Sequence, residues 1–206
     1  MENLQKELER IIDKNKRDGV KPTLLLHACC APCSSYCIEY LNEHFEITLF
    51  FYNPNIYPAD EYDYRVSELK RLVSEMGLSI PVLECENDTE SFYALARGRE
   101  SVREGGARCF DCYRLRLEKT AQLARAMGFD YFTTTLSISP LKNSAKLREI
   151  GLELEGKYGV KNLPSDFKKK EGYKRSIELS KQYNLYRQNY CGCEYSKKER
   201  ESGDEV

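Results

Sequence analysis

Short apolar runs alternate with longer amphipathic stretches along this chain, which predicts strands alternating with helices. Apolar runs bounded by turn residues predict strands over Thr23–His27, Ile47–Tyr52, Ile80–Glu84, Tyr131–Thr135 and Val160–Leu163. Helical spacing and glycine stops predict helices from Leu4 to the residue before Gly19, and over Cys33–Leu41, Ala59–Met76, Thr89–Ala96, Cys112–Met127, Pro140–Tyr158 and Gly172–Tyr186. The segment Gly98–Arg108, rich in glycine and arginine, is expected to be a loop.

This alternation is typical of an α/β protein with an open, mostly parallel sheet and helices on both of its faces. We see no repeat, linker or domain boundary, so we expect residues 1–206 to form one domain. In such sheets ligands bind beyond the carboxyl ends of the strands. Cys29 and Cys30 directly follow the first predicted strand, and the loop before Cys109 can reach the same edge. The fold therefore allows two distant cysteine pairs to converge.

Composition indicates a soluble globular protein, with 41% hydrophobic and 32% charged residues among 206. No apolar run approaches the roughly 20 residues of a membrane helix, and the first residues are charged rather than apolar. We therefore expect a cytoplasmic protein in a reducing compartment. Structural disulfides are rare there, so clustered cysteines point to metal binding or redox chemistry.

Nine cysteines are present, and burial as small hydrophobes suits Cys37 and Cys85. The others stand in the groups CCAPC, CFDC and CGC. One interpretation is a structural zinc held by the pairs Cys30-x2-Cys33 and Cys109-x2-Cys112. The long gap between these pairs is unusual for a compact zinc module, and zinc leaves Cys29 and the CGC pair without a role.

A second interpretation is a thioredoxin-like dithiol, because CAPC lies between a strand and a helix, where a thiol pKa is lowered. That chemistry leaves the remaining cysteines unused. A radical-enzyme motif is excluded, since Tyr36 and Tyr40 occupy the positions of its third cysteine. The fourth interpretation is an iron–sulfur cluster held by Cys29, Cys30, Cys109 and Cys112. The residues alone favour the cluster only modestly over zinc.

Net charge is −1, but two segments are locally basic. Arg97–Arg116 holds six arginines against three acidic residues, and Lys157–Arg175 holds seven basic residues against two acidic ones. Such segments either bind a phosphate backbone or form a solvated charged face.

Four motifs, HACCAPCSSYC, GARCFDCYRLRLEKTA, TTTLSISPLKN and YCGCEYS, resemble those of the epoxyqueuosine reductase (QueH) family in order. The resemblance extends from Leu24 to Ser196. It implies an enzyme that reduces the epoxide of epoxyqueuosine to queuosine at the wobble position of tRNA, with an electron donor that the sequence does not identify. It also implies a sheet similar to that of ATP-pyrophosphatase nucleotide enzymes. Because HACCAPC has no glycine where those enzymes have a phosphate loop, we expect no ATP binding.

By resemblance, Cys29, Cys30, Cys109 and Cys112 are the ligands of a 4Fe-4S cluster. Cys191 and Cys193 are implied to form a redox-active disulfide, which would close a very small ring. The alternative for this last pair is two unconnected thiols at the C-terminus. The resemblance also suggests an additional iron ion beside the cluster, for which Cys33 and Asp111 are the nearest residues in sequence.

Further side chains beside these motifs have two interpretations each. His27 either protonates a leaving oxygen or is a hydrogen-bonded group at a strand end. Tyr36, Tyr113, Tyr190 and Tyr195 are placed to stack on anticodon bases, whereas Tyr52 and Tyr57 are expected in the core or at its edge. A zinc-stabilised RNA-binding module without catalysis is the alternative function.

Overall fold

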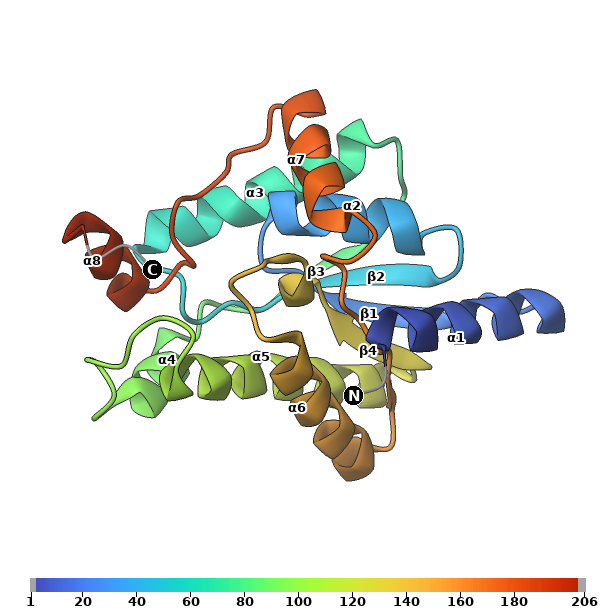
Figure 1. Ribbon diagram of the computed structural model, residues 1–206, viewed down its shortest axis with the longest axis horizontal. Helices are drawn as coiled ribbons and strands as arrows, with labels where there is room; N and C mark the ends of the chain where they lie inside the picture. The colour runs from blue at the N-terminus through green and yellow to red at the C-terminus, as the bar shows by residue number, and fades with distance from the viewer. Residues whose placement is uncertain (1–2, 204–206) are drawn as a thin grey trace.

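A computed structural model describes residues 3–203; the ends of the predicted domain, residues 1–2 and 204–206, lie outside the described residues. Its five strands form a parallel sheet in the order β3-β2-β1-β4-β5 (Figure 1). The strands are β1 (Thr23–His27), β2 (Glu46–Phe51), β3 (Val82–Glu84), β4 (Tyr131–Thr134) and β5 (Lys161–Asn162). The predicted α/β class and open parallel sheet are confirmed.

Strand β1 lies at the centre of the sheet and fixes where the site is built. His27, its last residue, is in register with Phe50 of β2 and Thr134 of β4. The chain leaves β1 toward β2 on one side, while β4 pairs on the other side, so the strand order reverses between β1 and β4. Crevices at such reversals are where doubly wound sheets bind ligands.

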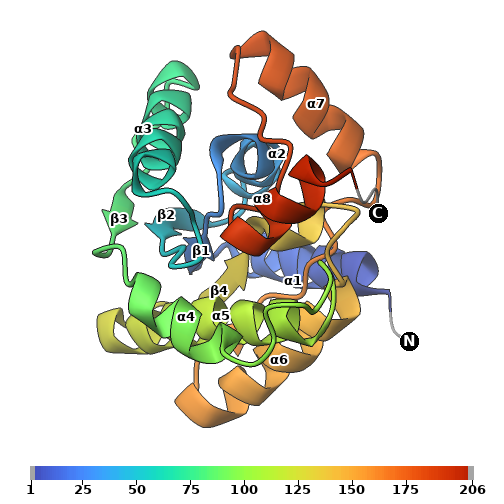
Figure 2. The same ribbon diagram turned by 90° about the vertical axis from the view of Figure 1, so that its left-hand side faces the viewer.

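Helices cover both faces of the sheet (Figures 1 and 2). The helices are α1 (Leu4–Asp18), α2 (Ala31–Leu41), α3 (Ala59–Glu75), α4 (Thr89–Ala96), α5 (Ala107–Met127), α6 (Ser144–Tyr158), α7 (Gly172–Gln182) and α8 (Glu194–Glu201), with a 3₁₀ helix η1 at Thr135–Ile138. Apolar residues of α1, α2 and α3 form one core with β1 and β2. Residues of α5 and α6 form a second core on the opposite face.

Several helices differ from the sequence predictions: α2, α5 and α6 begin at other residues, α3 and α7 end earlier, and α8 is additional. Helix α5 begins at Ala107 rather than Cys112, because Gly106 serves as its N-cap. Helix α6 begins at Ser144, where the Asn143 side chain accepts a hydrogen bond from the backbone of Lys146, and Pro140 lies in the preceding turn. Helix α8 was not predicted, since its sequence EYSKKERE has almost no apolar face.

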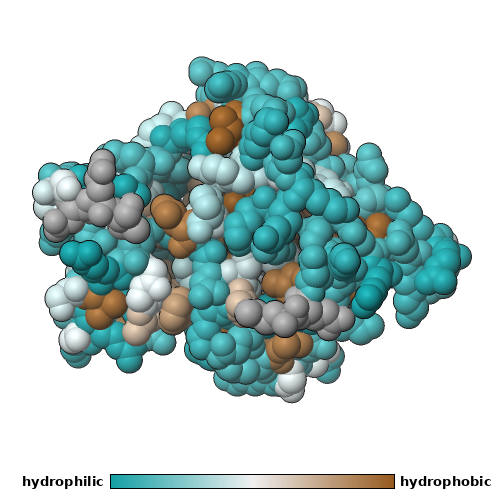
Figure 3. All heavy atoms as spheres, in the orientation of Figure 1, coloured by the Kyte–Doolittle hydropathy of each residue, from teal (hydrophilic) through white to brown (hydrophobic). Residues whose placement is uncertain are grey.

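Within residues 3–203 we find no helix long and apolar enough to cross a membrane. The face shown in Figure 3 is mostly hydrophilic, with apolar residues in small, separate groups.

Candidate functional site

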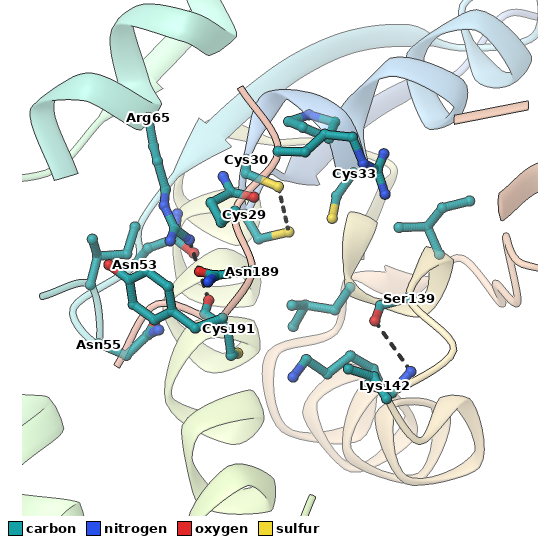
Figure 4. Close-up of a pocket in the computed structure, with 18 of the residues that line it drawn as sticks. Cys29, Cys30, Cys33, Asn53, Asn55, Arg65, Ser139, Lys142, Asn189 and Cys191 are labelled. Carbon is teal, nitrogen blue, oxygen red and sulfur yellow. Dashed lines mark hydrogen bonds between the residues drawn. The ribbon is translucent and has the colours of Figure 1, made fainter. Parts of the chain in front are cut away.

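The first cysteine group comprises Cys29, Cys30 and Cys33, where the chain leaves β1 and enters α2. Cys30 is the N-cap of α2 in extended conformation, and Pro32 follows in the first helical turn. The three Sγ atoms all lie within 4.8 Å of one another. Thr135, just beyond β4, accepts a hydrogen bond from the Cys29 amide at 3.2 Å. The group therefore sits at the reversal between β1 and β4, as Figure 4 shows from within the cavity.

The pKa values of these three thiols depend on one another, because the thiols are in contact. The Sγ atoms of Cys29 and Cys30 hydrogen-bond each other at 3.9 Å. Hydrogen bonds from Cys30 and from Cys33 hold the pKa of Cys29 well below its usual value. The same contact with Cys29 raises the pKa of Cys30 to about 12. The group is thus arranged to carry negative charge on Cys29, the state in which a thiol binds metal.

The second cysteine group comprises Cys109 and Cys112 of α5 with Cys191 and Cys193 near the C-terminus, and it lines a smaller cavity. The Cys109 sulfur accepts a hydrogen bond from the Gly105 amide at 3.2 Å. Burial raises the pKa of Cys109, and it raises the pKa of Cys112 to about 11. These thiols are protonated in the absence of a partner charge.

The two cysteine groups line adjoining cavities rather than forming one tight cluster. The larger cavity, of 170 Å³, is lined by the first group and Cys191. Asn55, Glu104, Arg116 and Cys191 line both cavities. The sequence placed Cys109 and Cys112 beside Cys29 and Cys30; in the structure the third thiol within 4.8 Å is Cys33, and the α5 pair lies in the next cavity.

The predicted disulfide between Cys191 and Cys193 is not formed, and all nine cysteines are free. The two side chains lie in different environments. Cys191 lines both cavities, whereas Cys193 is buried and caps α8, its sulfur accepting from the Ser196 amide at 3.4 Å. Burial raises the pKa of Cys193 to about 12. Gly192 between them has φ +130°, a backbone conformation that favours glycine.

Buried polar atoms without a partner gather around these two cavities. Five of the eight such atoms among the described residues belong to cavity-lining side chains: Asn55, Arg65, Arg108, Tyr113 and Arg116. Burial opposes the charge of Arg116, but the thiols of Cys112, Cys191 and Cys29 raise its pKa, so it stays cationic. Buried donors without acceptors are costly, and here they surround thiols. The cavities are therefore suited to an anionic group bound by cysteines.

His27 and Asp111 lie outside these cavities. The His27 ring is fully buried, with Nδ1 at 2.8 Å from Thr134 Oγ1 and Nε2 at 3.1 Å from the Tyr52 carbonyl. Burial lowers its pKa to about 4. His27 thus fits the structural interpretation, as a neutral hydrogen-bonded group. Asp111 forms an ion pair with Arg99 at the surface.

The two basic segments place their cations differently, and contact with a phosphate backbone stays a prediction for both. Arg108 and Arg116 of the first segment are among the most buried side chains of the protein. In the second segment five of the seven cations pair with carboxylates, in Lys157–Glu118, Lys168–Asp166, Lys170–Glu9, Lys174–Glu171 and Arg175–Glu39. Charge counting cannot show either outcome, because both depend on packing.

Of the four tyrosines expected to stack on bases, one lines the larger cavity and the other three pack against the protein. Tyr190 lines the larger cavity, but Tyr113 is buried, Tyr195 lies against the Arg108 guanidinium and Tyr36 stacks on Tyr40. Tyr52 is in the core as expected, whereas Tyr57 is exposed.

Sequence reasoning missed five charged residues that line the larger cavity. Arg187 and Arg200 are exposed, whereas the side chains of Arg65, Glu104 and Lys142 are buried. These three residues lie in helix or loop segments whose sequences are typical of solvent-exposed positions. Their burial arises only when the chain folds.

Comparisons of the sequence with known proteins match most of the chain. Residues 24–199 match the family described as epoxyqueuosine reductase QueH. The chain is 42% identical over 200 residues to an epoxyqueuosine reductase QueH of Streptococcus pyogenes serotype M1, covering 95% of this chain and 78% of that protein. It is 38% identical over 179 residues to the Thermotoga maritima protein of the same name, covering 86% and 92%.

Two solved structures share the fold at low sequence identity. One is the U34-tRNA thiolase NcsA from Methanococcus maripaludis with its [4Fe-4S] cluster, with TM-score 0.53, 14% identity, and 94% and 68% of the two chains covered. The other is NMN synthetase from Francisella tularensis, with TM-score 0.51, 10% identity, and 98% and 82% covered. Both agree with the expected likeness to the ATP-pyrophosphatase sheet.

Proposed function

Because the chain belongs to the epoxyqueuosine reductase QueH family, a family of oxidoreductases, we propose that it reduces the epoxide of epoxyqueuosine in tRNA to queuosine with an iron–sulfur cluster. The observation that carries the proposal is the group of three thiols within 4.8 Å at the carboxyl edge of the sheet, beside buried guanidinium groups that each keep one nitrogen without a hydrogen-bond partner.

The reaction itself favours iron over zinc. Converting an epoxide to an alkene takes two electrons and two protons and releases water. Zinc carries no electrons, whereas iron–sulfur clusters are held by cysteine thiolates and transfer electrons one at a time. Cysteine-ligated clusters are anionic, which suits the buried donors of Arg65 and Arg116.

We assign the ligands to both cysteine groups: Cys29 and Cys30 after β1, with Cys109 and Cys112 at the start of α5. The adjoining cavities support this assignment, because Arg116 and Cys191 line both of them. Cys33 is the thiol left over in the first group and is the nearest donor for an additional iron ion. Asp111, which pairs with Arg99 at the surface, lines neither cavity.

The protein's own residues would bind and orient the nucleotide. Tyr190 and the exposed Tyr173 line the larger cavity and offer rings for stacking. Arg187 and Arg200 line the same cavity, are exposed and form no close ion pair in the described part of the chain, so they are placed to meet phosphates. The substrate is thus proposed to be the anticodon arm of tRNA, with the modified base in the cavity.

Cys191 is proposed to pass electrons to this site as one half of a dithiol with Cys193. Its position between the two cavities supports the role, and a disulfide would form on oxidation after turnover. The donor that reduces the pair again belongs to an unidentified partner.

The reductase assay tests the function directly. Anaerobically reconstituted protein is incubated with epoxyqueuosine-containing tRNA and a chemical reductant. The tRNA is then digested to nucleosides, whose masses are measured by mass spectrometry. Loss of one oxygen from the modified nucleoside is the expected result. Tight binding of the tRNA without any conversion would favour the RNA-binding module instead.

A further inference from the structure

Removal of the epoxide oxygen as water needs two protons, and the cysteine groups account only for the electrons. We propose that Lys142 is the catalytic residue that binds the epoxide oxygen and protonates it as the carbon–oxygen bond breaks. This inference rests on the proposed function, because the reacting oxygen is that of the epoxide.

A tight turn after η1 delivers Lys142 into the larger cavity. The Lys142 amide donates to the Ser139 carbonyl at 3.1 Å, and the Leu141 amide donates to Ser139 Oγ at 3.3 Å. The turn leaves Leu141 47% exposed but only 7% of Lys142. Figure 4 shows Ser139 and Lys142 on the wall across the cavity from Cys30 and Cys33. The segment TTTLSISPLKN thereby acquires a role that its sequence did not reveal.

A hydrogen-bond chain fixes the Lys142 ammonium beside Cys191. Its Nζ donates to Glu104 Oε1 at 2.6 Å, and both side chains are almost completely buried. Glu104 Oε2 accepts from Ser196 Oγ at 2.8 Å, and Ser196 Oγ accepts from the Cys191 amide at 2.9 Å. Glu104 is the acceptor that the described residues give this ammonium, which has three protons to donate. The remaining protons are available to a ligand in the cavity.

Other groups in the cavity are less suited to proton transfer. Its arginines do not release protons at ordinary pH. Tyr190 is committed to the Tyr57 carbonyl, to which its hydroxyl donates at 2.7 Å. Tyr173 stands at the mouth with 37% of its surface exposed. Lys142 is the one lysine among the described residues that line the cavity.

The step balances as follows. Two electrons from a one-electron donor of the iron–sulfur class reduce one substrate carbon as the first carbon–oxygen bond breaks, and the oxygen keeps the bonding pair and takes a proton from Nζ. The reduced carbon then forms the carbon–carbon double bond as the second carbon–oxygen bond breaks, and a second proton, from Nζ once it has been reprotonated, releases the oxygen as water. The amine regains both protons from water at the cavity mouth. Burial lowers the pKa of Lys142, but Cys191, Tyr113 and Glu104 together raise it well above its usual value. The amine is therefore charged before the reaction, and an alkoxide is a stronger base still.

Lys142→Arg is the decisive variant, because arginine keeps the charge and can pair with Glu104 but does not give up a proton. We expect its single-turnover rate with a chemical reductant to fall by about 10²–10⁴-fold. Iron and sulfide content and tRNA affinity should stay at the native level. Lys146→Arg is the matched control, since Lys146 pairs with Glu149 on α6 and does not line the cavity.

A second pair of measurements guards against a fold defect. Lys142→Ala, which leaves Glu104 without its partner, is assayed with added ethylammonium, and Lys142→Met is combined with Glu104→Gln to remove both charges. Partial recovery of rate by ethylammonium is expected, as is a slow but folded double variant.

A Lys142→Arg protein with a native single-turnover rate would overturn the proposal, and an equal loss in Tyr173→Phe alone would move the role to that tyrosine. Failure of the native protein to convert epoxyqueuosine would refute the proposed function instead, which separates the two outcomes.

Discussion

The two cysteine groups are assembled by different means. The first forms within five consecutive residues, Cys29 to Cys33, where the chain passes from β1 into α2, and its thiols contact one another and share charge. The second joins Cys109 and Cys112 to residues about eighty positions away, and burial raises the pKa of Cys109, Cys112 and Cys193. Local geometry alone therefore prepares the first group for metal. The second depends on how the C-terminal segment packs against α5.

Buried cations tie the two groups together. Arg116 lies between them and stays charged because thiols of both groups surround it. Arg65 donates to the Cys191 carbonyl at 3.3 Å and packs closely against Gly192, which holds the C-terminal loop over the first group. The first cysteine group is formed by neighbouring residues alone, whereas the second is completed by a segment near the C-terminus.

Removing cysteine ligands should have the largest effect. If one cluster spans both groups, Cys29→Ala and Cys109→Ala proteins should lose bound iron and sulfide alike, and with them all reductase activity. Cys85→Ala is the matched control, since that thiol lies outside both groups. Measured iron and sulfide after anaerobic reconstitution decide the point. Retention of iron in Cys109→Ala would confine the metal to the first group.

The C-terminal thiols should matter for repeated turnover rather than for cluster binding. We expect a Cys191→Ser, Cys193→Ser double variant to keep its iron and to complete a single turnover with chemical reductant, but not to continue. Serine is a good N-cap, so α8 should remain folded. Product formed per protein is the measurement. Native multiple turnover in this variant would remove the redox role of the pair.

His27 should make metal-free protein less stable in acid. Its pKa is about 4 in the folded protein and near 6.5 when unfolded, so the neutral ring contributes stability above pH 6.5 that is lost as pH falls toward 4. The full loss is about 3 kcal/mol, from roughly 1.4 kcal/mol per pKa unit. Denaturant titrations at several pH values give the free energy of unfolding, and its dependence on pH should be weaker in the His27→Gln variant than in the native protein. An equal dependence in the two proteins would contradict the structural role.

Substitution of single arginines that line the larger cavity should have the smallest effects, each a modest loss of tRNA affinity. Arg187→Ala and Arg200→Ala should each weaken affinity and reduce the salt slope by about 1, as expected when a phosphate contact is lost. Lys168→Ala should change neither, because Lys168 is already paired with Asp166. Titrations at several salt concentrations compare them. A larger effect from Lys168 would return the docking surface to the Lys157–Arg175 segment.

Periodicity was sufficient to predict the sheet but not the second half of the site. The strand Thr23–His27 was predicted with its correct bounds, since an apolar run stands between Pro22 and the cysteines. The charged run of α8 carries no such signal, so the helix whose Ser196 supports Glu104 and Cys191 was missed.

Burial of charge was the other feature that the sequence concealed. Arg116 and Lys142 stand in segments that look solvated, and only the packing of α5 and the η1 turn places them at the cavities. Cysteine spacing located the edge of the sheet where the site lies. It did not reveal that the thiol closest to Cys29 and Cys30 would be that of Cys33 rather than one of the α5 pair.

The metal content of the native protein tests the central claim most directly. Protein purified without oxygen should be brown, with broad visible absorption and about four iron and four sulfide per chain, as a cluster spanning both cysteine groups requires. A colourless protein with stoichiometric zinc and no sulfide would contradict the account and leave a zinc-stabilised module in its place.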